Sequence, residues 1–348
     1  MPQPKTKTAK KPGLTVAVTG PTGDIGLPLL RTLDATTGIA KVVGMARRPF
    51  DPAAMGLRKT SYVQGDVTRR EDVDALVKGA DVVVHLAFVI IAGSDQSERV
   101  NLAGSRNVFE AAVAAKAKRL VYASSVAAYG FHEDNPDLLT EDVPTRGTEG
   151  HPYSHHKSQV EGLLHEVIDP SKVDAYVFRP CIVAGPDALM LIEQIPYVRL
   201  GERLPAVVRQ LFDSVPVLKP VLPDPGVPFQ LVHHDDVASA MKAAVLGKGE
   251  PGVYNLAGPG ELTMRNLADA LGYYTVPLPE LAVDATAEVV ARLPFMPDEA
   301  TWIEAFRTPV LMDTAKARRE LSWRPEHDAI ETLRATVAAA REDLDASA

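Results

Sequence analysis

Apolar runs alternate along the first half of the chain with segments whose apolar residues recur every three or four positions. The run Leu14–Val18 is rich in β-branched residues and is typical of a buried parallel strand. The segment Asp24–Ala35 carries a stripe of isoleucine and leucine on one face and is typical of a helix. Strands that alternate with helices at this spacing predict an α/β fold with a parallel, doubly wound sheet. By the same patterns we predict further strands at residues 40–46, 60–63, 81–87, 119–123 and 174–179, and helices at 70–78, 101–116 and 153–168.

Between the first strand and the first helix, Gly20, Gly23 and Gly26 lie three residues apart. Glycine permits the unusual backbone angles and the close approach that such a turn needs. The N-terminus of the helix offers free N–H groups and the positive end of its dipole to an anion. In this strand–turn–helix context the glycines predict a seat for the pyrophosphate of a dinucleotide. The residues expected to bind the cofactor here are Gly20, Thr22, Gly23, Asp24 and Ile25.

The second half of the chain is less regular than the first. Prolines are frequent and periodicity is poor from Gly185 to Pro228, which is typical of loops and short helices. Strand and helix patterns return after this segment. We therefore expect a disordered tail at residues 1–12, a dinucleotide-binding domain at 13–180 with 229–257 returning to it, and a smaller C-terminal substrate-binding lobe at 181–228 and 258–348.

The second predicted strand ends in Arg47 and Arg48. In dinucleotide-binding folds an acidic residue at this place binds the 2′-hydroxyl of the adenosine ribose, whereas arginine accommodates a 2′-phosphate. Ala46 stands where the acid would be. The sequence therefore predicts that Arg47 binds the cofactor and that NADP is preferred, with NAD possible. The alternative is a solvated basic turn.

Tyr153 and Lys157 lie four residues apart in a predicted helix and so share one face. A free tyrosine has a pKa of about 10 and is a poor base at neutral pH, but a neighbouring ammonium favours the phenolate. Tyr153 is therefore expected to exchange a proton with a substrate hydroxyl while a nicotinamide carries the hydride. Ser125, at the end of the fifth predicted strand, is expected to hydrogen-bond the same substrate oxygen. Ser124 is the alternative for that role.

Several shorter stretches accompany the glycine triplet and the tyrosine–lysine pair in one order between about residues 14 and 330. With them, the chain resembles the extended short-chain dehydrogenases/reductases, of the NAD(P)-dependent epimerase/dehydratase type, which have a Rossmann-type fold. The resemblance implies a cofactor site that also contains Asp66 at the adenine, Val67, Leu86, Ala87, Tyr153, Lys157 and Pro180. For Asp66, a turn-forming role after Gly65 is the alternative. It also implies a homodimer formed through the helix of the tyrosine–lysine pair and the helix before it. The matching stretches are Asp66-Val67, His85-Leu86-Ala87, Asn101, Ser124-Ser125-x-x-x-Tyr129-Gly130, Arg179-Pro180, His234-Asp235-Asp236-Val237, Tyr254-Asn255-Leu256-Ala257 and Leu321-Ser322-Trp323-Arg324-Pro325.

Two departures from the family bear on the substrate. Sugar dehydratases of the family carry an acidic pair where this chain has Ser125-Val126-Ala127, and many epimerases carry Phe-Asn where it has Arg179-Pro180. We therefore expect an oxidoreductase that moves a hydride between a nicotinamide and a secondary alcohol or ketone carbon. A nucleotide-sugar epimerase that uses the same half-reaction is the alternative. A non-catalytic, cofactor-binding regulator is a second alternative.

Composition narrows the class of partner. The chain has 348 residues, 46% of them hydrophobic and 24% charged, which is ordinary for a globular protein. Its net charge of −8 argues against a nucleic acid or an anionic membrane as partner, so we expect a small-molecule substrate. A single cysteine, Cys181, cannot form an internal disulfide. With no signal peptide or long apolar run at the N-terminus, a cytoplasmic location is expected.

Histidines offer further candidates. His155 and His156 lie within the turn of the tyrosine–lysine helix and are expected to be solvated, with substrate contact as the alternative. The run His233-His234-Asp235-Asp236 has metal-ligand residue types, but its place at a predicted helix start favours capping, and no metal is expected. Cys181 is interpreted as a small buried hydrophobic residue.

Overall fold

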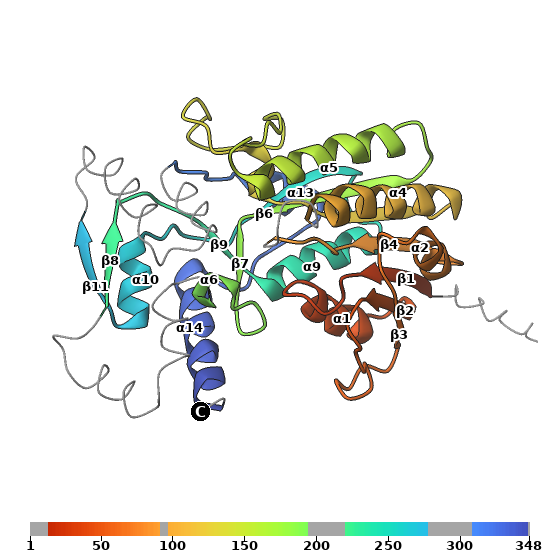
Figure 1. Cartoon of the computed structure of the whole chain (residues 1–348), viewed down its shortest axis with the longest axis horizontal. Helices are drawn as coiled ribbons and strands as arrows, with labels where there is room; N and C mark the ends of the chain where they lie inside the picture. Colours follow the sequence, from red (N-terminus) through yellow and green to blue (C-terminus); the bar gives the residue numbers. More distant parts are fainter. Residues whose placement is uncertain (1–12, 91–96, 194–219, 278–307, 347–348) are drawn as a thin grey trace, which may run out of the picture.

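A parallel sheet forms the centre of the protein (Figure 1). The computed structural model describes residues 13–90, 97–193, 220–277 and 308–346, so the tail predicted at 1–12 lies outside the described residues. All pairings in the sheet are parallel, and its order is β10-β6-β5-β4-β1-β2-β3. The strands are β1 (Leu14–Thr19), β2 (Ile39–Ala46), β3 (Thr60–Gln64), β4 (Val82–His85), β5 (Arg119–Ala123), β6 (Asp174–Pro180) and β10 (Gly252–Leu256).

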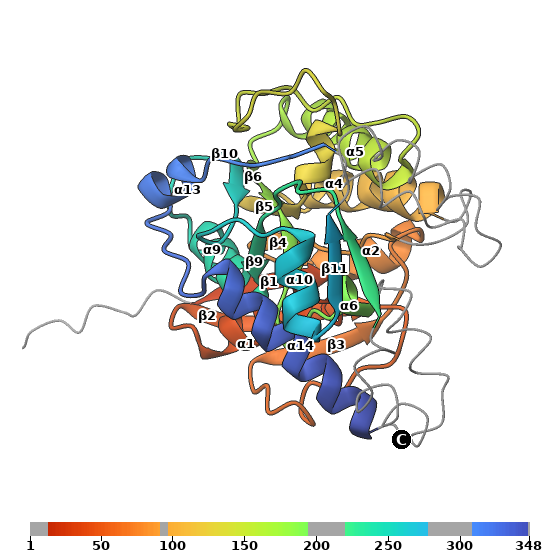
Figure 2. The same cartoon turned by 90° about the vertical axis from the view of Figure 1, so that its left-hand side faces the viewer.

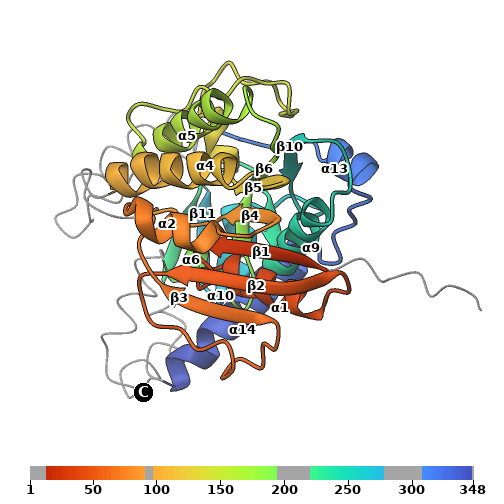
Figure 3. The same cartoon turned by 90° about the vertical axis from the view of Figure 1, so that its right-hand side faces the viewer.

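Helices cover both faces of this sheet, which confirms the predicted doubly wound α/β fold (Figure 3). One apolar core lies between the strands and α1 and α9. A second core lies between the strands and α2, α4 and α5 on the opposite face. The helices are α1 (Gly26–Ala35), α2 (Arg70–Val77), α4 (Ser105–Ala114), α5 (Pro152–Ile168) and α9 (His234–Val245).

The predicted helix at 101–116 differs from the observed one. It is preceded by a π-helical turn, η1 (Arg99–Gly104), and α4 begins only at Ser105. π-Helical turns are rare in proteins, but those that occur are often found at functional sites. The turn allows the Asn101 side chain to lie buried in the protein, as described below.

A smaller lobe lies beside the sheet, at the end where its strands β6 and β10 lead out (Figure 2). Of the segment 229–257, α9 and β10 pack on or join the central sheet, whereas β9 pairs with β7 outside it. A third apolar core joins the small sheets to α10 and α14. The remaining elements are η2 (Val126–Tyr129), β7 (Ile182–Ala184), α6 (Met190–Glu193), β8 (Val221–Asp224), β9 (Leu231–His233), α10 (Met264–Leu271), β11 (Tyr274–Pro277), α13 (Ala315–Glu320) and α14 (Ala329–Ala346).

Candidate active site

The glycine turn after β1 is built against the loop that follows β4. Gly20 has a φ of +68°, and a Cβ on it would lie 2.7 Å from the amide nitrogen of Ala87. A Cβ on Gly26 would lie 2.3 Å from the carbonyl oxygen of Gly20, so the start of α1 packs directly on the turn. Gly23 is different, because its Cβ would meet nothing closer than 3.8 Å. The turn therefore has a packed side and an open side, and Thr22 and Gly23 form the exposed tip.

The start of α1 shows the features of an anion seat. Ile25 precedes the helix, makes no side-chain cap, and packs partly buried against the core, while Asp24 is half-buried. The first turn of α1 carries no acidic residue. Its N-terminal N–H groups and dipole therefore act on an anion without a competing carboxylate in that turn.

The ends of β2 and β3 lie side by side, and with them Arg47 and Asp66. The amide of Gly65 donates to the carbonyl oxygen of Ala46 at 3.0 Å. Gln64 Nε2 donates to the carbonyl oxygen of Arg47 at 2.8 Å, while the Arg47 side chain is exposed. The amide of Gly20 also donates to the carbonyl oxygen of Met45 at 3.0 Å, so the backbone at the end of β2 lies against the glycine turn.

Asp66 forms the turn that leads into α2. Its Oδ1 accepts hydrogen bonds from the amide and the hydroxyl of Thr68, each at 2.9 Å. This is the turn-forming role of aspartate. Val67 is buried against η1, where a Cβ on Gly104 would lie 2.7 Å from its Cγ2.

A buried histidine holds the end of β4. Thr19 Oγ1 lies 2.7 Å from His85 Nδ1, and His85 Nε2 lies 2.9 Å from Ser105 Oγ. Thr19 Oγ1 also accepts the amides of Leu86 and Ala87, each at 3.3 Å. Burial, and then the charge of Lys157, lower the pKa of His85 from 6.5 to about 3, so the ring is neutral. His85 therefore fixes the backbone that faces the glycine turn without adding charge.

Asn101, which matched the family pattern without an assigned role, holds the loop after β4. Its Oδ1 accepts the amide of Val89 at 2.8 Å, and its Nδ2 donates to the Val89 carbonyl oxygen at 2.9 Å. Asn101 Nδ2 also lies 3.4 Å from His156 Nδ1. The prediction that His156 is solvated is wrong, because its ring is buried beside Asn101 and burial lowers its pKa.

Ser125 and Tyr153 come together at the end of β5. α5 begins with Pro152 in its first turn and with a cap in which His151 Nδ1 accepts the amide of Ser154 at 3.2 Å. Ser154 Oγ donates to the carbonyl oxygen of Ala127 at 2.7 Å, which ties the helix start to η2. The Ser125 side chain lies near enough to Tyr153 to lower the pKa of its phenol. These contacts set the phenol beside the serine hydroxyl.

Lys157 lies beneath this pair and is buried. Its Nζ donates to the carbonyl oxygen of Ala123 at 2.7 Å and lies 3.7 Å from the centre of the Phe88 ring. Nζ is 5.8 Å from the centre of the Tyr153 ring. The structure thus brings Ser125, Tyr153 and Lys157 to one place.

The electrostatics of this trio differ from the expectation. Burial raises the pKa of Tyr153 above 10.0, and the neighbouring Ser125 side chain offsets this only in part. The expected lowering by Lys157 is not found, because burial lowers the pKa of Lys157 itself from 10.5 to about 7, against the opposing charge of Glu161. At neutral pH the phenol is therefore protonated and the lysine is only partly charged.

Ser124 is engaged elsewhere. Its hydroxyl donates to the carboxylate of Glu161 on α5, and Glu161 also accepts from Arg179, with Nε at 3.0 Å and Nη2 at 2.6 Å. Both ionic side chains are buried. Sequence reasoning missed Glu161, although its place one helical turn beyond Lys157 is visible in the sequence. Pro180 ends β6 beside Leu256, and Cys181 is buried with a raised thiol pKa, as its interpretation as a small hydrophobic residue predicts.

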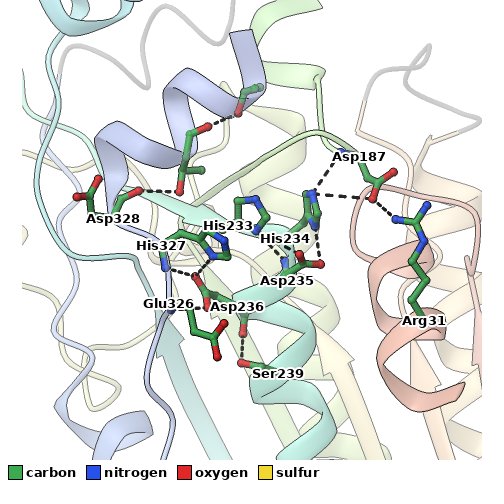
Figure 4. Close-up of polar contacts among 12 residues, drawn as sticks. Arg31, Asp187, His233, His234, Asp235, Asp236, Ser239, Glu326, His327 and Asp328 are labelled. Carbon is green, nitrogen blue, oxygen red and sulfur yellow. Dashed lines mark hydrogen bonds and ion pairs between the residues drawn. The ribbon is translucent and has the colours of Figure 1, made fainter. Parts of the chain in front are cut away.

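Three adjacent residues at the start of α9 have the spacing of metal ligands (Figure 4). Within the described residues, ligand atoms of His233, His234 and Asp235 lie within 4.8 Å of one another. The ring nitrogens are already engaged: His233 Nδ1 accepts the amide of Asp235 and His234 Nε2 accepts the amide of Asp187, each at 3.2 Å. His234 Nδ1 lies 3.0 Å from Asp235 Oδ1. The lone pairs that a metal would need accept backbone N–H groups, and His233 caps α9.

Asp236 joins α9 to the segment before α14. Its carboxylate accepts the amides of Glu326 at 2.7 Å and of His327 at 3.2 Å. The His327 ring stacks on His233 with centroids 3.8 Å apart (Figure 4). The histidine–aspartate run therefore connects the central sheet to the smaller lobe.

Comparison with known proteins adds to this geometry. A model of the NAD-dependent epimerase/dehydratase family matches residues 16–257, which includes the glycine turn, the tyrosine–lysine pair and β10. The chain belongs to this family. An epimerase/dehydratase-family protein is a nicotinamide-dependent enzyme with a Rossmann-type fold, so the alternative of a non-catalytic regulator is set aside.

Two curated relatives share part of this family member's sequence. Human 3 beta-hydroxysteroid dehydrogenase type 7 is 32% identical over 169 residues, covering 46% of this chain and 46% of that protein. The 2-alkyl-3-oxoalkanoate reductase of Shewanella oneidensis is 30% identical over 187 residues, covering 51% of this chain and 47% of that protein. The matches thus span about half the length of these two relatives.

A solved structure shows the same fold over nearly the whole family member. The UDP-glucuronic acid 4-epimerase of Bacillus cereus, in complex with NAD, superposes with a TM-score of 0.70 at 18% identity, covering 95% of this chain and 100% of that one. Within the described part of the chain, no helix has the length and apolar character needed to cross a bilayer.

Proposed function

We propose that this enzyme transfers a hydride between a nicotinamide cofactor and a secondary alcohol or ketone carbon, with Ser125, Tyr153 and Lys157 as its catalytic residues. The observation that carries the proposal is that Tyr153 and the buried Lys157 share one face of α5 at the end of β5, where Ser125 follows, with Lys157 Nζ 5.8 Å from the centre of the Tyr153 ring. The three groups lie at the carboxyl ends of the sheet strands, where ligands of such folds bind.

The residues of the crevice fit a dinucleotide. Gly23 leaves its side of the turn open, and α1 directs its N-terminal N–H groups there. When bound, the nicotinamide supplies or accepts the hydride. Lys157 is suited to orient its ribose, and Ser125 to hydrogen-bond the substrate oxygen.

Tyr153 is the group that moves the proton. Because its pKa is raised, the phenol is in the form that donates a proton to a ketone oxygen as that oxygen gains charge. In the reverse direction the phenolate must form first, and a charged Lys157 stabilises it. The arrangement in the free protein therefore favours reduction of a ketone.

The curated relatives suggest the substrate class. One is named for a hydroxysteroid and the other for a 2-alkyl-3-oxoalkanoate. Both names describe an oxygen-bearing carbon in a molecule with a large hydrocarbon part. We extend this class to the present enzyme, with a nucleotide-sugar epimerase, as in the Bacillus cereus structure, kept as the second candidate.

The test mixes the purified protein with NADPH and a 2-alkyl-3-oxoalkanoate, with NADP⁺ and a 3β-hydroxysteroid, and with UDP-glucose. Consumption of NADPH with the oxoalkanoate, or formation of NADPH with the hydroxysteroid, supports the proposal. Conversion of the sugar without free NADPH supports the epimerase instead.

Tyr153→Phe tests the residue assignment, with the half-exposed Tyr274→Phe as control. We expect Tyr153→Phe to lower turnover by about 10²- to 10⁴-fold while NADPH still binds. Turnover close to that of the control would contradict the role of Tyr153.

The cofactor preference and the assembly belong to the same proposal. The exposed Arg47, with Ala46 in place of an acid, supports a preference for NADP over NAD. A homodimer through α4 and α5 is expected from the family resemblance. Light scattering of the purified chain measures the assembly, and a monomer would contradict it.

A further inference from the structure

A buried ion pair lies behind the proposed catalytic residues. Glu161 and Arg179 expose only 1% and 4% of their surface. Two hydrogen bonds join them, and the Ser124 hydroxyl adds a third to the same carboxylate. The Arg179 guanidinium also lies over the Tyr129 ring, 4.5 Å from its centre. Charge-assisted bonds of this kind offset part of the cost of burying both ions, although Nη1 of Arg179 is buried without a hydrogen-bond partner.

The pair is placed to act on Lys157. Glu161 follows Lys157 by four residues in α5, so the two side chains lie on one helix face with Cβ atoms about 6 Å apart. Ser124 immediately precedes Ser125, and its amide donates to the carbonyl oxygen of Phe178 at 2.8 Å. The carboxylate is thus connected to both elements that carry the proposed catalytic side chains.

We propose that Glu161 is a positioning residue of the reaction: anchored by Arg179 and Ser124, it holds a negative charge beside Lys157 and raises the protonated fraction of that buried lysine. This role rests on the proposed function of Lys157. The neutral His85 on β4 and the protonated Tyr122 and Tyr153 add no negative charge near Lys157 at neutral pH. The Arg179 cation on β6, which is bonded to Glu161, opposes part of the effect of that carboxylate on Lys157.

The balance at Lys157 makes this contribution decisive. Burial lowers the pKa of Lys157 to about 7 even though the charge of Glu161 opposes it. Without that charge the lysine would be mostly neutral at pH 7. A neutral lysine cannot stabilise a phenolate at Tyr153. The geometry therefore connects a buried ion pair to the charge state of the proposed catalytic lysine.

The experiment titrates Lys157 directly in the full-length protein labelled with ¹³Cε-lysine. The Lys157 resonance is assigned from its loss in Lys157→Met. In Glu161→Gln, we expect the titration midpoint to fall by about one pH unit. Glu166→Gln is the matched control, since Glu166 lies on the same helix and pairs with Arg106 at 3.1 Å but is 64% exposed. The control should leave the midpoint unchanged.

A second variant guards against misfolding. Glu161→Met with Arg179→Met replaces the whole pair with apolar side chains, a change that buried pairs often tolerate. The midpoint should fall here by less than in Glu161→Gln, because the Arg179 cation is removed together with the Glu161 carboxylate. An unchanged midpoint in the folded single variant, or in the double variant if the single one does not fold, would overturn the proposal.

Turnover provides the functional arm, using the substrate that the preceding assays identify. Glu161→Gln should be about fivefold slower than the parent at pH 7 and equal to it near pH 5.5. A loss that is the same at every pH would indicate a merely structural role and overturn the inference. If instead Tyr153→Phe retains turnover, the proposed function fails while the lysine titration still tests the coupling to Glu161.

Discussion

Two glycines in one turn should respond to the same substitution in opposite ways. A methyl group at Gly26 would lie 2.3 Å from the carbonyl oxygen of Gly20 and 2.6 Å from the carbonyl carbon of Pro21. These are backbone atoms, which cannot turn aside as a side chain can. A methyl group at Gly23 would lie 3.8 Å from its nearest neighbour, which is an ordinary contact. The first change strains the protein, and the second fills the open side of the turn.

The expected magnitudes follow from these distances. Gly26→Ala should lower the free energy of unfolding by about 3 kcal/mol, the upper end of ordinary overpacking. Gly23→Ala should change it by less than about 0.5 kcal/mol. For NADPH binding, Gly23→Ala should cost about 2 kcal/mol, or about thirtyfold in dissociation constant, because a methyl group keeps the pyrophosphate from the N–H groups.

Urea unfolding followed by circular dichroism measures the first quantity, and the fluorescence of bound NADPH measures the second. The two variants are each other's control, since both add one methyl group within four residues. If Gly23→Ala binds NADPH as tightly as the parent, the open side of the turn is not the pyrophosphate seat. Equal destabilisation by both changes would refute the packing argument.

Three further outcomes are expected. Arg47→Ala should reduce the ratio of the NADH to the NADPH dissociation constant about tenfold. The control Arg58→Ala, at another exposed arginine, should leave that ratio unchanged. Equal dissociation constants for the two cofactors in the parent protein would contradict this prediction. Burial, and then two neighbouring histidines, lower the pKa of His233 to about 4. The unfolded chain therefore binds a proton at this histidine more readily than the folded protein does. As the pH falls from 6.5 to 4, the free energy of unfolding should fall by about 3 kcal/mol. His233→Asn, which can keep the cap, should show a shallower fall in urea unfolding; an unchanged slope would argue against this source. Asn101→Ala removes two hydrogen bonds to the backbone of Val89 and should lower the free energy of unfolding by about 2 to 3 kcal/mol in the same assay. A decrease below about 0.5 kcal/mol would show that the loop does not depend on Asn101.

The alternating strands and helices could be predicted because burial leaves a period in the sequence. A strand such as β4 is buried on both faces and is therefore apolar throughout, and α1 buries one stripe of leucines. The π-helical turn at Asn101 leaves no such period. Asn101 in this turn makes two hydrogen bonds to the backbone of Val89, twelve residues earlier in the chain. Local sequence preferences do not predict such a contact.

The proposed catalytic residues could be named from the sequence, but not their charge states. The spacing of Tyr153 and Lys157 predicted that they share one helix face, and in the structure Lys157 Nζ lies 5.8 Å from the centre of the Tyr153 ring. The predicted direction of the Tyr153 pKa was wrong because the phenol itself is buried, and burial raises its pKa. The depth of burial depends on contacts between separate elements, which the spacing in the sequence does not give. The burial of His156 was missed for the same reason, since its partner Asn101 comes from another element.

The charge states also answer how a chain of net charge −8 can seat an anionic cofactor. Burial keeps His85 neutral and Lys157 only partly charged, and Arg179 is offset by Glu161. Side-chain cations in the crevice therefore contribute little attraction at its nicotinamide end. The attraction must come from the N–H groups at the start of α1 and, at the adenosine end, from the exposed Arg47. Under the proposed function, discrimination between the two cofactors depends on Arg47, since arginine at this place in dinucleotide-binding folds accommodates a 2′-phosphate.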